Sequence, residues 1–165
     1  MNFLDLLESN KIDKILINEF NEWVVYLKDI KGFSRNTYNS YSYDLVDFLL
    51  FLNNYHASLI TTEEIINLNL KILRAWLTDL TQNRNYKNVY KTPLSARSRR
   101  RAISSLKNFL LYLKKHSNSY ENAFNQLLLV NNPKVPKSLP KAIEETQIKE
   151  LLNELENVSK KKWIK

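Results

Sequence analysis

Gly32 is the only glycine in the chain, and this scarcity limits the folds available to it. Tight β-hairpins rely on residues that adopt a positive φ, and glycine does so most readily. A chain of 165 residues with one glycine is therefore poorly suited to a β-rich fold. Three of its four prolines fall between residues 133 and 140, which leaves long stretches free of residues that break helices. We expect an all-α fold.

Apolar residues recur at the spacing of amphipathic helices along most of the first 130 residues. Asp13, Ser34 and Ser95 precede three of these segments and are typical N-cap residues, while Thr61 and Glu64 form a capping-box pattern. The pattern predicts a small bundle of four to five helices. The predicted helices span 14–31, 35–56, 70–82, 96–115 and 120–129, with one short turn after residue 61 and a polar loop over 83–94.

The sequence changes character after residue 130. Pro133, Pro136 and Pro140 lie close together and predict an extended, stiff linker. An amphipathic segment, EETQIKELLNELENV, follows and predicts one extra helix whose apolar stripe has no partner in the bundle. We therefore expect a helical domain over 1–130, a linker over 131–142 and the start of a further domain over 143–165.

The basic residues are concentrated in one part of the chain. The formal net charge is +8, yet residues 1–79 hold 7 basic and 11 acidic side chains. Residues 80–120 hold 10 basic side chains and no acidic one. A one-sided basic tract is typical of a protein that binds a polyanion.

The predicted helix over 96–115 carries an apolar stripe on one face and cations on the other. Each cation in the first turns of a helix is disfavoured by about 0.3–1 kcal/mol, and no acid within the tract offsets their repulsion. Phosphate groups would reverse both effects, and arginine suits phosphates and guanine edges. The alternative is an ordinary solvated helix face. We favour nucleic-acid contact through Arg97, Ser98, Arg100, Arg101, Ser104, Lys107 and Lys114.

The start of the predicted helix over 35–56 is a second candidate. Free N–H groups and short polar side chains at a helix start suit a phosphate. Simple capping by Ser34 is the alternative explanation of the same residues. The candidates here are Arg35, Asn36, Thr37 and Ser40, and Lys137 and Lys141 of the linker complete the DNA-binding set.

No pattern in the sequence indicates catalysis, a cofactor or a metal site. His56 and His116 each fall near a predicted helix C-terminus, where a capping role is the stronger explanation. Cysteine is absent, the N-terminus lacks the pattern of a secretory signal, and the longest apolar run is too short to span a bilayer. We expect a cytoplasmic protein with no membrane partner.

Three segments together resemble the Xer-type tyrosine recombinases. The first segment matches a helix pattern that begins at a serine cap, and the second matches a basic helix pattern. The third segment, "NPKVPKSLPK", is similar to the family's interdomain linker. The matching residues are Ser34, Thr37, Tyr41, Asp44, Leu45, Phe48, Phe51, Leu52, Leu94, Ser95, Ser98, Arg101, Ser104, Lys107, Phe109, Tyr112 and Leu113.

The resemblance implies a SAM-like core-binding domain, an orthogonal helical bundle whose second and fourth helices approach duplex DNA. It implies binding to one half-site of an inverted-repeat recombination site, in chromosome dimer resolution or DNA integration. Residues 143–165 would then be the start of the catalytic domain. The family's catalytic arginines, lysine, His-x-x-Arg motif and tyrosine nucleophile are not matched, so we expect no strand cleavage by these residues.

A helical protein-interaction module is the alternative. Such a module would regulate or assemble with a full-length recombinase, because the family acts as a tetramer on DNA. The segment after the linker would dock on a partner subunit in that case. Adding DNA of random sequence separates the two hypotheses, because an adaptor would not bind it.

Overall fold

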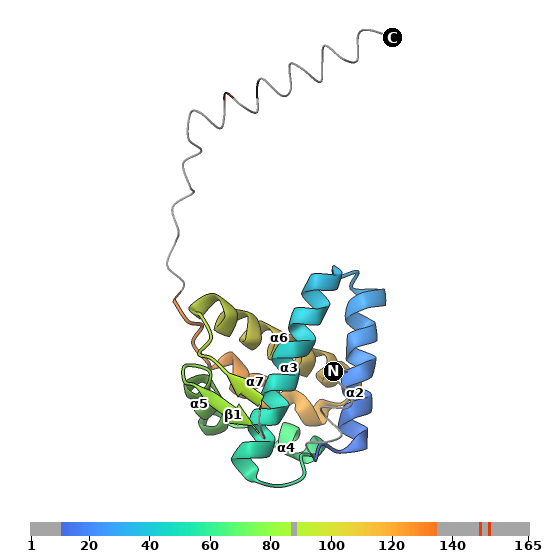
Figure 1. Cartoon of the computed structure of the whole chain (residues 1–165). Helices are drawn as coiled ribbons and strands as arrows, with labels where there is room; N and C mark the ends of the chain where they lie inside the picture. Colours follow the sequence, from blue (N-terminus) through green and yellow to red (C-terminus); the bar gives the residue numbers. More distant parts are fainter. Residues whose placement is uncertain (1–10, 87–88, 135–148, 150–151, 153–165) are drawn as a thin grey trace. The chain divides into compact units, whose positions relative to one another are not determined.

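A computed structural model describes residues 11–86, 89–134, 149 and 152 (Figure 1). The chain divides into two units, Met1–Val135 and Pro136–Lys165, and the fold described below belongs to the first. The predicted linker and extra helix fall almost wholly outside the described residues, and so do Lys137 and Lys141. The domain boundaries therefore stay predictions.

The first helix, α2 (Lys14–Val25), begins where the sequence predicts, because Asp13 accepts a hydrogen bond from the Ile15 N–H at 3.2 Å. It continues into one π-helical turn, η1 (Tyr26–Ile30). Gly32 follows with φ of 62°, a conformation that side chains disfavour. The single glycine thus stands where the chain reverses direction.

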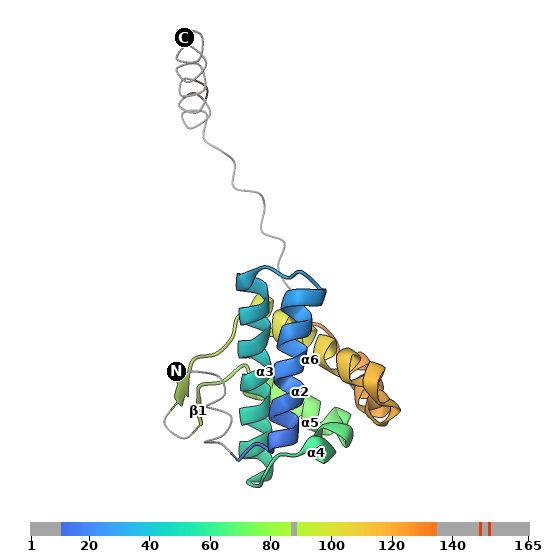
Figure 2. The ribbon, with the colours of Figure 1, turned by 90° about the vertical axis from the view of Figure 1, so that its right-hand side faces the viewer.

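The second long helix, α3 (Arg35–His56), runs back antiparallel to α2 (Figure 2). Ser34 caps its start by accepting from the Thr37 N–H, and Ala57 ends it in the left-handed conformation. Two shorter helices follow, α4 (Thr62–Ile66) and α5 (Leu70–Asp79). The predicted capping box of Thr61 and Glu64 is confirmed at the start of α4.

The second half of the basic tract forms the long helix α6 (Ala96–His116), which crosses α2 and α3 (Figures 1 and 2). A single 3-10 turn, η2 (Asn118–Tyr120), leads into α7 (Glu121–Leu128). The all-α prediction is confirmed, with each of the five predicted helices present.

The predicted loop over 83–94 is wrong in part. Its centre forms an antiparallel hairpin of β1 (Arg84–Tyr86) and β2 (Val89–Lys91), with Arg84 paired to Lys91. The hairpin forms without glycine because side chains of another element hold it. Arg84 is 4% exposed and donates to the Asp47 carboxylate of α3 at 2.5 Å.

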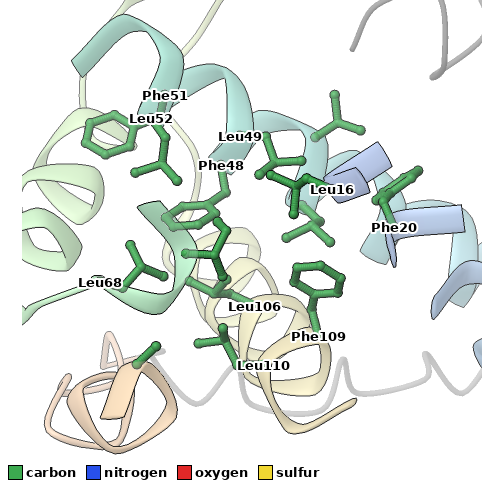
Figure 3. Packing of buried hydrophobic residues seen from close by; sticks show 14 of the residues in the cluster. Leu16, Phe20, Phe48, Leu49, Phe51, Leu52, Leu68, Leu106, Phe109 and Leu110 are labelled. Carbon is green, nitrogen blue, oxygen red and sulfur yellow. The ribbon is translucent and has the colours of Figure 1, made fainter. Parts of the chain in front are cut away.

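One hydrophobic core joins α2, α3 and α6 (Figure 3). Trp23 and Phe109 meet edge to face at 5.4 Å between ring centroids, and Phe48 meets Trp76 in the same way at 4.9 Å. Trp23 and Trp76 are fully buried. The core fixes which face of α6 points inward, and therefore which face its cations occupy.

Candidate nucleic-acid interface

Helix α6 separates its apolar and basic residues onto two faces. Ser95 caps it by accepting from the Ser98 N–H at 3.2 Å, while Ile103, Leu106 and Phe109 are buried. Exposed residues at steps of three or four line the other face. We call this set the α6 ridge: Arg97, Arg100, Ser104 and Lys107.

The three cations of the α6 ridge have no ion pair within the part of the chain that the structure describes. Ser104 is a small residue between them, and its hydroxyl donates to the Arg100 carbonyl at 3.0 Å. The first turns of α6 also contain no acid. The ridge therefore keeps the unfavourable helix-end charge that the sequence indicates, and an anion would relieve it.

Several other cations of the basic tract pair with acids that lie outside the tract. Lys114 contacts Glu121 at 2.8 Å and lies over the Phe124 ring. Arg84 and Lys91 of the hairpin both pair with Asp47. Within the described residues, the α6 ridge therefore holds three of the tract's cations that have no acidic partner.

Arg101 is the most strongly held of the predicted site residues. Its Nε donates to Asp44 Oδ2 at 2.7 Å and its Nη2 donates to Oδ1 at 2.9 Å. The Asp44 side chain is 6% exposed, whereas the Arg101 side chain is 44% exposed. Burial raises the pKa of Asp44, and the hydrogen bond and charge of Arg101 oppose that rise. The same contact raises the pKa of Arg101, so the guanidinium stays charged.

The start of α3 is exposed on the same unit. Arg35 and Asn36 are exposed, while Thr37 and Ser40 are half-buried. The Thr37 hydroxyl lies 2.8 Å from that of Ser34, so capping occupies part of this surface. The structure therefore supports the capping explanation for Thr37 and leaves Arg35 and Asn36 open to solvent.

Helices α3 and α6 contact each other along the polar side as well as in the core. Ser105 donates to the Tyr41 carbonyl at 2.7 Å, one turn from the Asp44–Arg101 pair. Thr37, Ser40 and Asp44 lie at steps of three or four on one face of α3, so this face extends from the start of the helix to Arg101. The pair thus links the α3 start to the α6 ridge.

A cleft of about 180 Å³ lies beside the α6 ridge, between α6 and the end of α7. Arg100, Ser104 and Lys107 form its basic wall, and Leu127 and Leu128 form its apolar wall. Asn108 does not join this surface, because its side chain turns inward and accepts from Trp23 Nε1 at 2.9 Å. Arg99 also turns back, donating to the Leu94 carbonyl.

The sequence predicted neither the hairpin nor the acidic partner of Arg101. Asp44 and Asp47 lie one turn apart in a helix that is otherwise apolar there. A buried carboxylate requires a partner, so these two acids were the available signal. The positions of the two acids along the chain do not show which cation pairs with each of them.

The described residues offer no arrangement suited to catalysis. No group of three His, Cys, Asp or Glu side chains among them could hold a metal ion. Tyr120 donates to Glu19 Oε1 at 2.8 Å, and burial raises the pKa of its phenol, which disfavours a phenolate nucleophile. His116 ends α6 and lies 2.9 Å from the Tyr112 carbonyl. Within the same part of the chain, no helix is long and apolar enough to cross a membrane.

Comparison with known proteins gives a consistent result. The family model described as "Phage integrase, N-terminal SAM-like domain" matches residues 20–117. The chain is 32% identical to tyrosine recombinase XerC of Rickettsia africae over 144 residues, which is 87% of this chain and 43% of that protein. It is 29% identical to XerC of Rickettsia felis over 153 residues, 93% of this chain and 46% of that protein.

The chain spans less than half the length of the curated relatives it matches. No solved structure matches it. The matched segment contains α3, the hairpin and α6, which are the elements that build the candidate interface. This chain belongs to the phage integrase family of tyrosine recombinases, of which it carries the N-terminal SAM-like core-binding domain.

Proposed function

We propose that this chain binds duplex DNA and holds one half-site of an inverted-repeat recombination site. The observation that carries the proposal is the α6 ridge, where three exposed cations share a helix face with no acid in the first turn. Phosphates would neutralise these charges, and the contacts would position the domain without reading sequence. Arg35 and Asn36, exposed at the start of α3, are further candidates for phosphate contact.

Strand cleavage is assigned to the part of the relatives that this chain does not match. The relatives are named tyrosine recombinases, and the family model that matches here describes an N-terminal domain. We propose that the domain contributes DNA binding to site-specific recombination and that recombinase subunits assemble beside it on DNA. Chromosome dimer resolution and DNA integration are the processes in which such an activity would serve.

The test is fluorescence anisotropy with a labelled duplex of about 30 base pairs at several salt concentrations. Non-specific binding by such a surface is expected at a Kd of about 10⁻⁴–10⁻⁶ M at physiological salt. Arg97→Ala should weaken binding, because it removes one exposed cation of the ridge. Arg74→Ala is the matched control, since Arg74 is exposed on α5, away from α6. Equal effects of the two variants would contradict the assignment of the ridge.

A further inference from the structure

The contact between Arg101 and Asp44 uses one edge of the guanidinium group. Nε and Nη2 face the two carboxylate oxygens, at 2.7 and 2.9 Å. A guanidinium has five N–H donors in a fixed plane, and this side-on contact takes two of them. The end-on edge, formed by Nη1 and the second hydrogen of Nη2, makes no further hydrogen bond within the described part of the chain.

The carboxylate that holds Arg101 is itself fixed. Asp44 belongs to the buried middle of α3 and its side chain is 6% exposed, so it cannot swing toward solvent. The Arg101 side chain is 44% exposed at the other end of the contact. Three N–H donors remain, and the structure presents the two parallel ones of the end-on edge in one orientation, without the rotamer freedom of an unpaired arginine.

The ion pair with Asp44 also changes which kind of ligand Arg101 can bind. Asp44 neutralises most of the field of the guanidinium, so the pair attracts a phosphate less than Arg97 or Arg100 does. The two free donors keep their direction, which matches a pair of neutral acceptors. In duplex DNA the O6 and N7 atoms of guanine form such a pair in the major groove.

The surroundings leave room for this contact. Arg101 lines an open cleft of about 380 Å³ between α3, the hairpin and α6. Exposed rings flank it: Tyr43 is 63% and Tyr90 is 66% exposed. Asp47 in the cleft pairs with Arg84 and Lys91, and Asp79 lies 3.7 Å from Arg84, so these two acids and two cations leave little net charge beside Arg101.

We propose that Arg101, oriented by Asp44, reads a guanine in the major groove, whereas the cations of the α6 ridge contact phosphates. This inference rests on the proposed function, because it requires that duplex DNA lie on α6. It makes Arg101 a specificity-determining residue and Asp44 its positioning residue.

The experiment selects binding sites from a pool of random duplexes with the 165-residue chain, then measures affinity for the selected duplex and its single-base variants. Wild type should select a guanine at one position of the half-site and prefer it by roughly 5- to 150-fold over other bases. Arg101→Lys keeps the charge but lacks the planar fork, so the preference at that position should fall while other positions keep theirs. Arg74→Lys, at an exposed position of α5 outside the proposed interface, is the matched control and should leave the selected sequence unchanged.

Asp44→Asn tests the positioning role of Asp44 through DNA affinity and its salt dependence, which a purely structural role would leave unchanged. It frees the charge of Arg101, so binding to non-selected DNA should strengthen and its salt slope should steepen by about 0.9. The guanine preference should fall at the same time. A circular dichroism melt checks its folding, and Arg101→Lys decides the question if Asp44→Asn does not fold.

The outcomes separate this inference from the proposed function. An undiminished preference for the same guanine in Arg101→Lys would overturn the inference while DNA binding stands. Uniform weakening of all sequences by Arg101→Ala, with a shallower salt slope, would show a phosphate contact and would also overturn it. Absence of any binding by wild type would overturn the proposed function as well.

Discussion

Asp47 holds the hairpin to α3, and replacing it with alanine should destabilise the domain strongly. Its carboxylate contacts Arg84 at 2.5 Å and also pairs with Lys91. The Arg84 side chain is 2% exposed, so Asp47→Ala leaves a buried guanidinium short of its main partner. Breaking a buried ion pair from one side costs about 3–5 kcal/mol. Asp79 remains 3.7 Å from Arg84, so we expect the lower end, about 3 kcal/mol.

Urea denaturation followed by circular dichroism measures this loss as a lower midpoint at unchanged slope. The corresponding fall in Tm is about 10 °C for a domain of this size. Asp29→Ala is the control, because the Asp29 side chain is 53% exposed and lies 3.8 Å from Lys28, an exposed pair worth under about 0.5 kcal/mol. A loss below about 1 kcal/mol for Asp47→Ala would refute the conclusion that Asp47 anchors the hairpin.

Two further predictions concern the α2–α6 side of the domain. Burial raises the pKa of Glu19 despite its hydrogen bond from Tyr120. The protonated side chain therefore stabilises the fold as pH falls through this raised pKa, and that stabilisation is lost at neutral pH. Glu19→Gln should therefore raise the free energy of unfolding at pH 7, with a smaller gain near pH 4.5, the ordinary value; equal gains in denaturant titrations at both pH values would contradict this. Phe109→Ala removes a fully buried ring against Trp23 and should cost about 3–5 kcal/mol. Leu111→Ala, at a site 41% exposed on the same helix, should cost far less, and similar losses would mean that the packing is misassigned.

The helices could be predicted because their signals are local. Ser34 and Ser95 accept from N–H groups three residues away, and Thr61 with Glu64 forms a box within one turn. Such contacts depend on neighbouring residues alone, so the sequence pattern contains them. The apolar stripe of α6 likewise placed the ridge on the opposite face before any tertiary contact was considered.

The hairpin and the state of Arg101 could not be predicted because they depend on distant residues. Arg101 meets Asp44 across 57 positions, and Arg84 meets Asp47 across 37. Both cations belong to the basic tract, and charge alone predicted the same role for Arg101 as for Arg97. Only the packing of α3 against α6 and the hairpin distinguishes a paired arginine from an exposed one.

The salt dependence of duplex binding tests the central claim, that the α6 ridge holds DNA through phosphates. The logarithm of the affinity should fall linearly with the logarithm of salt concentration, by about 0.9 for each neutralised phosphate. Replacing Arg97, Arg100 and Lys107 together with alanine should make this slope shallower by up to about 2.7 and weaken binding at low salt. An unchanged slope in that triple variant, with its fold intact by circular dichroism, would contradict the assignment of the ridge.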